Sequence, residues 1–262
     1  MDKVAVVTGG AMGYKTGGKS IGGAVAVGLA RDGYKVVVVD LAETGQKTVD
    51  TIKESGGEAI FIKADVTDAA DVKKIVETIK EKYEGLNCLV NCVARYGLGM
   101  AKDVADITEE EWSQTLNVNL NGYFLMAKYS IPAMLASGGG SIVNISSIES
   151  FVSLPKFSVY SVSKAAIDAL TRSLATDFAP EIRTNSVLPG FVKIANSENN
   201  RSPEELDKWY QQVSKQYPMK RVCEVEEIAS VVSFLVSDKA SYINGQSIVV
   251  DGGKTIADVH EF

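Results

Sequence analysis

Short, unbroken runs of apolar residues alternate along the chain with longer segments in which apolar residues recur every three or four positions. The unbroken runs predict strands that are buried on both faces, and the longer segments predict amphipathic helices. We predict seven strands, at Val4–Val7, Val36–Val39, Ala59–Ile62, Cys88–Val90, Ile142–Ile145, Thr184–Leu188 and Ser247–Val250. We predict helices at Ile21–Arg31, Thr44–Ser55, Ala69–Tyr83, Glu109–Leu135, Val162–Phe178, Pro203–Gln216 and Val225–Leu235.

This alternation predicts an α/β fold, in which a parallel sheet of seven strands carries helices on both faces. No repeat, linker or low-complexity segment divides the chain, so residues 1–262 are expected to form one domain. The segment 191–219 is charged and aromatic, and we predict that it forms a lid over a substrate.

Composition narrows the classes of partner. A net charge of −6 argues against nucleic-acid binding, and no apolar run approaches the roughly 20 residues of a membrane span. The N-terminus enters a strand at once and has no signal-peptide layout, so we expect a cytoplasmic protein. The cysteines, Cys88, Cys92 and Cys223, have no metal-binding spacing, and His260 is the only histidine. A metal site and a histidine-based triad are therefore not expected.

The most informative stretch is Gly138–Lys164. An apolar strand ends in the hydroxyls of Ser146 and Ser147, and Tyr160 and Lys164 follow four residues apart in a helical pattern. Residues at this spacing share one helix face. A tyrosine has an ordinary pKa of about 10, and a nearby cation lowers it toward working pH. This pattern predicts a proton-transfer site in which Tyr160 exchanges the proton, Lys164 supplies the charge and a serine holds the substrate oxygen.

At these residues the sequence resembles the short-chain dehydrogenase/reductase family, and the resemblance spans nearly the whole chain. It implies a Rossmann-type doubly wound fold and reversible hydride transfer between NAD(H) and a secondary alcohol or ketone. It selects Ser147 over Ser146 as the catalytic serine, and it assigns Asn119 as a fourth catalytic residue that holds a proton-relaying water.

The resemblance also implies a cofactor site. Its predicted members are Gly9, Ser20, Ile21, Gly22, Asp40, Leu41, Asp65, Val66, Asn91, Tyr160, Lys164, Pro189, Gly190 and Val192. The chain departs from the family pattern in three places. The glycine-rich turn is seven residues longer and has Ser20 in place of its middle glycine, Ala94 replaces a glycine after Asn91, and Ile194 replaces a threonine. We predict that the longer turn wraps the diphosphate.

Two charged residues bear on the choice of cofactor. Asp40 ends the second strand, where a carboxylate bonds the ribose hydroxyls of NAD and repels the 2′-phosphate of NADP. Leu41 follows and offers no charge to hold that phosphate. Lys19 is the opposing signal, because NADP-dependent relatives often carry a basic residue there. We predict that NAD(H) is preferred over NADP(H).

A second class of protein also fits the first turn. Residues 13–20, GYKTGGKS, match the P-loop pattern of nucleotide-hydrolysing proteins, and they lie between a strand and a helix. This alternative leaves Asn119, Ser147, Tyr160 and Lys164 unexplained. A non-enzymatic NAD sensor is a third alternative.

Substrate and assembly are the least constrained features. The expected pocket wall, Tyr96, Met100, Phe151, Leu154 and Phe157 with the lid aromatics Trp209, Tyr210 and Tyr217, is mainly apolar. It favours a bulky apolar alcohol or ketone such as a hydroxysteroid or bile acid. A sugar, a polyol or a carrier-bound 3-oxoacyl chain stays open. By resemblance, we expect a homotetramer formed through the helices at Glu109–Leu135 and Val162–Phe178.

Overall fold

The protein is built on one sheet of seven parallel strands. The structure, a computed structural model, describes residues 3–13, 18–83, 85–96, 101–195 and 202–257. The strands are β1 (Val4–Thr8), β2 (Lys35–Asp40), β3 (Ala59–Lys63), β4 (Cys88–Asn91), β5 (Gly140–Ile145), β6 (Ile182–Pro189) and β7 (Ser247–Val250). Their order across the sheet is β3-β2-β1-β4-β5-β6-β7, and every neighbouring pair is parallel. This is the predicted doubly wound fold.

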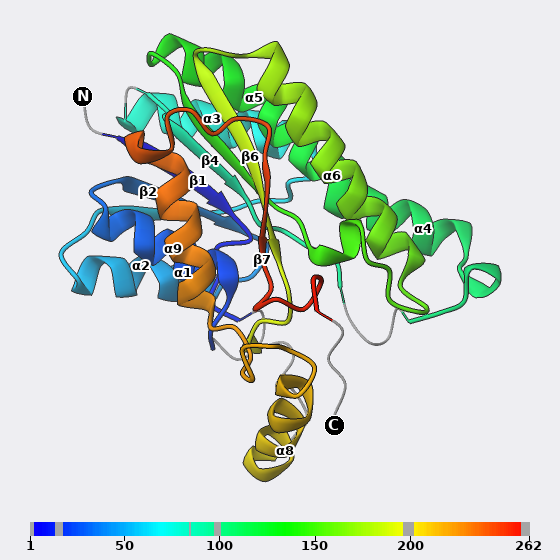
Figure 1. The fold of residues 1–262 in the computed structure, drawn as a ribbon. Helices are drawn as coiled ribbons and strands as arrows, with labels where there is room; N and C mark the ends of the chain where they lie inside the picture. Colours follow the sequence, from blue (N-terminus) through cyan, green and yellow to red (C-terminus); the bar gives the residue numbers. More distant parts are fainter. Residues whose placement is uncertain (1–2, 14–17, 84, 97–100, 196–201, 258–262) are drawn as a thin grey trace.

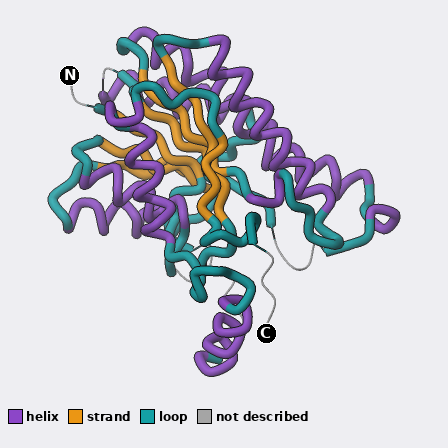
Figure 2. The backbone as a smooth tube through the Cα atoms, viewed as in Figure 1, coloured by secondary structure: helices purple, strands orange, loops and turns teal. Residues whose placement is uncertain are grey.

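Helices cover both faces of the sheet (Figures 1 and 2). The longer ones are α1 (Ile21–Arg31), α2 (Gly45–Glu54), α3 (Ala69–Tyr83), α4 (Glu109–Leu116), α5 (Gly122–Ala136), α6 (Ser158–Asp177), α8 (Pro203–Ser214) and α9 (Val225–Val236). Short helical turns lie at η2 (Val104–Asp106), η3 (Asn117–Asn121), η4 (Ile148–Ser150) and η5 (Asp238–Ala240). In Figure 1, α8 projects away from the body of the molecule, beyond one end of the strands.

Two hydrophobic cores result, because successive strand residues point to opposite faces. In β1, Ala5 and Val7 pack in the core that also contains buried residues of α1, α2 and α9. Val4 and Val6 pack in the other core, with buried residues of α3 and α5. The five inner strands are therefore buried on both sides, as their unbroken apolar sequences predict, whereas the edge strands β3 and β7 are partly exposed.

The predicted long helix Glu109–Leu135 forms, but a π turn interrupts its α-helical winding. Its first part, α4, begins at a capping box in which Thr108 and Glu111 bond each other's backbone N–H groups. At η3 (Asn117–Asn121) the chain makes a π turn, and α5 follows. A π turn inserts one extra residue into a helix and often occurs at functional sites. Here it contains Asn119, the predicted fourth catalytic residue.

The first turn brings β1 and α1 into close contact. Gly22 opens α1 so close to the preceding turn that an added Cβ would lie 2.1 Å from the carbonyl oxygen of Gly9. Gly9 has φ +64°, a conformation that favours glycine. Glycines are thus required at both positions by the backbone itself.

We predict that Gly22→Ala lowers the free energy of unfolding by about 2 kcal/mol or more, since the methyl group cannot fit without moving Gly9. Chemical denaturation measures this loss. Gly28→Ala is the matched control in the same helix, because its Cβ would meet only ordinary contacts at 3.6 and 3.7 Å. The control is expected to be neutral or to stabilise the helix by up to about 1 kcal/mol. Equal stability of the two variants would contradict the close approach.

Candidate active site

Tyr160 and Lys164 lie on the same face of α6, as their spacing predicts. The Lys164 Nζ atom is 5.5 Å from the centre of the Tyr160 ring and 5.8 Å from that of Tyr123. Lys164 is buried, whereas Tyr160 is half-buried. The backbone oxygen of Ile145, at the end of β5, accepts a hydrogen bond of 2.8 Å from Lys164 Nζ. The lysine therefore has one fixed place beside the phenol.

The two serines that end β5 have different tasks. Ser146 Oγ donates to the backbone oxygen of Lys164 and so attaches α6 to the strand. Ser147 Oγ accepts the backbone N–H of Glu149 at 3.2 Å and caps η4 (Ile148–Ser150). It also forms a side-chain hydrogen bond that lowers the Tyr160 pKa, opposing part of the effect of burial. The structure thus brings Ser147 and Tyr160 together, while Ser146 serves the scaffold.

Burial shifts the pKa values of both members of this pair. Burial raises the pKa of Tyr160 above its ordinary value, and the charge of Glu149 adds to that effect. Burial also lowers the pKa of Lys164 to about 8. In the chain by itself the effect of burial dominates the Tyr160 pKa, and the predicted lowering by Lys164 stays a prediction. A raised pKa favours the neutral phenol of Tyr160 over the phenolate.

Asn119 lies behind the pair, fully buried in the π turn. Its Oδ1 accepts the backbone N–H of Arg95 at 2.6 Å, and its Nδ2 donates to Ser163 Oγ at 3.0 Å. Ser163 Oγ in turn donates to the backbone oxygen of Tyr160. The side chain therefore joins the segment after β4 to the first turns of α6, and its predicted role in holding a water stays a prediction.

The side chains of Ser20 and Lys19 connect the glycine-rich turn to neighbouring segments, and the sequence pattern alone did not predict these contacts. Ser20 caps α1 by accepting the Gly23 N–H, and it donates to the backbone oxygen of Ala11. Lys19 Nζ lies 3.0 Å from Glu226 and 3.8 Å from Glu224. Residues 14–17 of the predicted diphosphate loop lie outside the described residues. The Ser20 hydroxyl thus donates its hydrogen to the backbone oxygen of Ala11. To bind a phosphate as predicted, Ser20 would have to give up this hydrogen bond.

The acidic residue at the end of β2 is held by backbone groups. The Asp40 carboxylate accepts the N–H groups of Ala11 and Ala42, at 3.1 and 3.0 Å. Leu41 beside it is half exposed to solvent. Both oxygens keep further lone pairs for a ligand, as a carboxylate that binds ribose hydroxyls requires.

The next predicted cofactor residues lie deeper. Asp65 Oδ1 accepts the backbone N–H and the hydroxyl of Thr67, and Val66 is buried against Gly122. Asn91 is buried at the end of β4 and donates from Nδ2 to Asn144 Oδ1 of β5. Its side chain therefore joins two strands, and its predicted contact with the cofactor stays a prediction.

The turn after β6 offers backbone groups to a ligand. Gly190, which follows Pro189, donates to the Val250 oxygen of β7. An isolated bridge pairs Val192 with Cys223, and its hydrogen bonds use the backbone of Phe191, Lys193 and Cys223. Within the described chain, the N–H of Val192 has no hydrogen-bond acceptor. With the close glycine turn and the Asp40 carboxylate, this suits a nicotinamide dinucleotide along the carboxyl ends of the strands.

The predicted substrate wall is only partly assembled. Tyr96 stacks on Phe157 with 5.5 Å between ring centres, and its ring lies tilted by 54° to that of Tyr160, with 4.8 Å between centres. Phe151 and Leu154 are about half exposed, and Leu154 lines a separate cavity of about 250 Å³ with Lys102 and Lys156. Met100 lies outside the described residues.

Sequence reasoning missed Glu149. This acidic residue is 7% exposed, follows Ser147 by two positions, and has no hydrogen-bond partner for its Oε2 atom. Burial raises its pKa from 4.5 to about 7, and the nearby Lys164 limits the rise. The available signal was an acidic residue two positions after the predicted catalytic serine, in a stretch with no other charge from Ser146 to Pro155.

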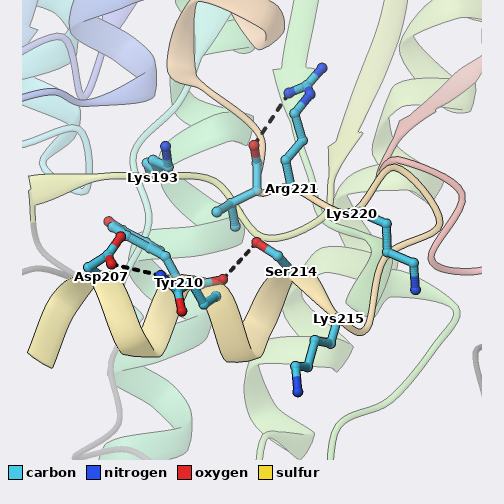
Figure 3. A pocket seen from close by; sticks show the side chains of 9 residues that line it. Lys193, Asp207, Tyr210, Ser214, Lys215, Lys220 and Arg221 are labelled. Carbon is cyan, nitrogen blue, oxygen red and sulfur yellow. Dashed lines mark hydrogen bonds between the residues drawn. The ribbon is translucent and has the colours of Figure 1, made fainter. Parts of the chain in front are cut away.

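The lid aromatics pack on one another. Phe191 lies edge-on to Trp209 at 5.0 Å and near Tyr210 at 6.3 Å, while Tyr217 is buried and its hydroxyl accepts the Phe191 N–H. Behind α8 is a cavity of about 330 Å³, shown in Figure 3. Its lining includes Lys193, Asp207, Tyr210, Ser214, Lys215, Lys220 and Arg221, and none of the residues predicted for catalysis.

The described residues were also considered for metal ligands and for membrane-spanning helices. The described part of the chain contains no group of three or more histidine, cysteine or acidic side chains placed to hold a metal ion. None of its helices combines the length and apolar character needed to span a bilayer.

Comparisons with known proteins agree with this geometry. The sequence profile described as enoyl-(acyl carrier protein) reductase matches residues 16–255. An NAD-dependent glycerol dehydrogenase from Listeria innocua is 36% identical over 97% of this chain and 94% of its own. An NADP-dependent (R)-specific alcohol dehydrogenase from Lentilactobacillus kefiri is 36% identical over 97% and 96%. The ligand-free structure of aldohexose dehydrogenase from Thermoplasma acidophilum aligns with a TM-score of 0.87 and 31% identity, covering 100% of this chain and 97% of that one.

We predict that Glu149→Gln stabilises the protein increasingly as pH rises. Because the Glu149 pKa is higher in the folded chain than the ordinary 4.5, wild type loses stability between about pH 4.5 and about pH 7, where the unfolded chain has released the proton that the folded chain still holds. The glutamine variant avoids that loss, so the difference in unfolding free energy should grow by roughly 2–3 kcal/mol over this range. Urea denaturation at a series of pH values measures it.

The exposed Glu77→Gln on α3 is the control for this experiment, and it should change stability by no more than about 0.5 kcal/mol throughout. A Glu149→Gln difference that stays constant with pH would contradict the burial of an unpaired carboxylate.

Proposed function

The chain belongs to the short-chain dehydrogenase/reductase family, and on that basis we propose that it interconverts a secondary alcohol and a ketone by NAD(H)-dependent hydride transfer. The observation that carries the proposal is the shared α6 face on which Tyr160 lies beside the fixed Lys164, with Ser147 within hydrogen-bonding reach. Membership of this family argues against the P-loop alternative. The lysine and serine that would bind phosphate in a P-loop have other partners here, because Lys19 pairs with Glu226 and Ser20 caps α1.

The bound nicotinamide would supply the hydride. The protein supplies the proton and the orientation. The raised pKa of Tyr160 keeps the phenol protonated, so it can donate to the oxygen of a ketone as that oxygen gains charge. Ser147 would polarise the same oxygen with its hydroxyl. A Lys164 that is charged near neutral pH would stabilise the phenolate left behind.

We further propose that NAD(H) is preferred over NADP(H). The Asp40 carboxylate is fixed at the end of β2, where it would repel a 2′-phosphate. The opposing signal from the sequence, Lys19, is engaged by Glu224 and Glu226. Of the two dehydrogenase relatives, one is named NAD-dependent and the other NADP-dependent. Family membership therefore does not decide the cofactor, and the proposal depends on individual residues such as Asp40.

Two classes of substrate compete for the site. The stacked Tyr96 and Phe157 support a bulky apolar substrate, of which a hydroxysteroid or bile acid is the predicted example. Glu149 favours the second class, sugars and polyols, because a buried carboxylate suits a substrate with additional hydroxyl groups. Glycerol and aldohexose dehydrogenases among the relatives add support to this second candidate.

Assembly as a homotetramer is also part of the proposal. Phe124 and Leu135 of α5 and Val162 of α6 are each more than two-fifths exposed, on the helices through which we expect the subunits to meet. The expected cytoplasmic location likewise stays a prediction.

We predict that Tyr160→Phe lowers kcat by about 10²–10⁴-fold, because it removes the proton donor. NADH affinity, measured by titration calorimetry, should change only a few-fold. Turnover is followed through NADH absorbance with a panel of hydroxysteroids, cyclic alcohols, polyols and sugars. The fully exposed Tyr242→Phe is the matched control and should retain wild-type turnover. An active Tyr160→Phe enzyme would refute the mechanism, and NADH binding without turnover of any substrate would favour an NAD sensor.

We predict that Asp40→Asn raises the ratio of kcat/KM with NADP to kcat/KM with NAD by about tenfold, since it removes the repelling charge and keeps an acceptor oxygen. Initial rates with each cofactor give the ratio. Asp50→Asn, on the exposed side of α2, is the control. An unchanged ratio in Asp40→Asn would defeat the assignment of Asp40.

A further inference from the structure

Glu149 is a buried carboxylate that the chain itself leaves unsatisfied. The residue lies in η4, and only 7% of its surface is exposed. Its Oε2 atom has no hydrogen-bond donor among the described residues. Leaving such an oxygen unpaired away from water destabilises the folded chain. Buried polar groups that cost stability are expected where a ligand later supplies the missing partner.

The position of Glu149 ties it to the reacting centre. Its backbone N–H donates to Ser147 Oγ, the hydroxyl expected to hold the substrate oxygen. Its charge raises the pKa of Tyr160, Tyr96 and Tyr217, so Glu149 is near all three phenols. Glu149 therefore lies among the groups that would surround a bound substrate, in the short turn that Ser147 caps.

The local charge restricts what the carboxylate can bind. Lys164 is close enough to lower the Glu149 pKa, and it already carries the cation of this site. A second cation, such as a substrate ammonium, would be repelled by that lysine. A neutral hydroxyl meets no such repulsion, and it can donate to a carboxylate or accept from a carboxylic acid.

We propose that Glu149 binds a second hydroxyl group of the substrate, next to the carbon that is oxidised, so that the natural substrate is a vicinal diol or polyol and the product an α-hydroxy ketone. This inference rests on the proposed function, because it assumes that Ser147 and Tyr160 hold the reacting oxygen. It assigns a substrate-binding role to a residue outside the Ser147, Tyr160 and Lys164 set.

A pair of substrates with one carbon skeleton tests the proposal. Butane-2,3-diol and butan-2-ol differ only in the second hydroxyl, and all stereoisomers of each are assayed with NAD. For wild type we expect the best diol to exceed the best mono-alcohol in kcat/KM by at least about tenfold. Glu149→Leu, which keeps the size and removes both acceptor oxygens, should lower this ratio by about 10–100-fold. Glu149→Gln keeps one acceptor oxygen and should give an intermediate ratio.

The control for surface charge is Glu77→Leu on α3, which should keep the wild-type ratio. A ratio that Glu149→Leu and Glu149→Gln leave unchanged, or an equal fall for both substrates, overturns the proposal. If turnover is too slow to measure, thermal stability can report on substrate binding instead. With NADH present, the diol should raise the Tm of wild type more than the mono-alcohol does, and this difference should vanish in Glu149→Leu.

The outcomes distinguish the role of Glu149 in binding the substrate from the proposed hydride transfer itself. If wild type oxidises both alcohols equally well and Tyr160→Phe abolishes both activities, the proposed function stands and the role of Glu149 is wrong. If no compound is turned over and the diol gives no added rise in Tm, the role of Glu149 is wrong as well, and the proposed function is then decided by the wider substrate panel.

Discussion

The backbone oxygen of Ile145 is the point on which the candidate site depends. It lies at the end of β5 and accepts two hydrogen bonds, from Lys164 Nζ at 2.8 Å and from the Tyr123 hydroxyl at 3.0 Å. One carbonyl thus joins the strand to α5 and α6. A buried ammonium needs such acceptors, because desolvation otherwise favours its neutral form. The same contact fixes the helix turn that carries Tyr160, so the scaffold and the chemistry share one anchor.

Hydrogen bonds between buried polar side chains also connect the sheet to α6. Asn91 of β4 donates to Asn144 of β5, which donates to Thr171 of α6. Each member is buried, and the hydrogen bonds between them hold β4, β5 and α6 in register. Such a connected network specifies one arrangement, because breaking any link leaves a buried polar group unpaired. The position of α6 is therefore set by directional bonds as well as by apolar packing.

The fold and most of the proton-transfer site could be predicted from the sequence, because both depend on short-range patterns. Unbroken apolar runs such as Val36–Val39 predict buried strands, and the four-residue spacing of Tyr160 and Lys164 predicts a shared helix face. The electrostatics could not be predicted. The Tyr160 pKa depends on the depth of burial and on Glu149, neither of which its spacing from Lys164 reveals. The tasks of Ser20, Lys19 and Asn91 also depend on partners distant in sequence.

The π turn at Asn117–Asn121 has a geometric consequence for how this region tolerates change. Each residue of an α-helix advances the chain by about 100° around the axis. A π turn needs more residues per revolution, so its extra residue is absorbed within the turn and α4 and α5 keep nearly the mutual orientation of a regular helix. Deleting one residue of the turn would therefore leave both flanking helices close to their present places. It would change mainly which side chain occupies the position of Asn119, so the extra residue acts on the local placement of that side chain.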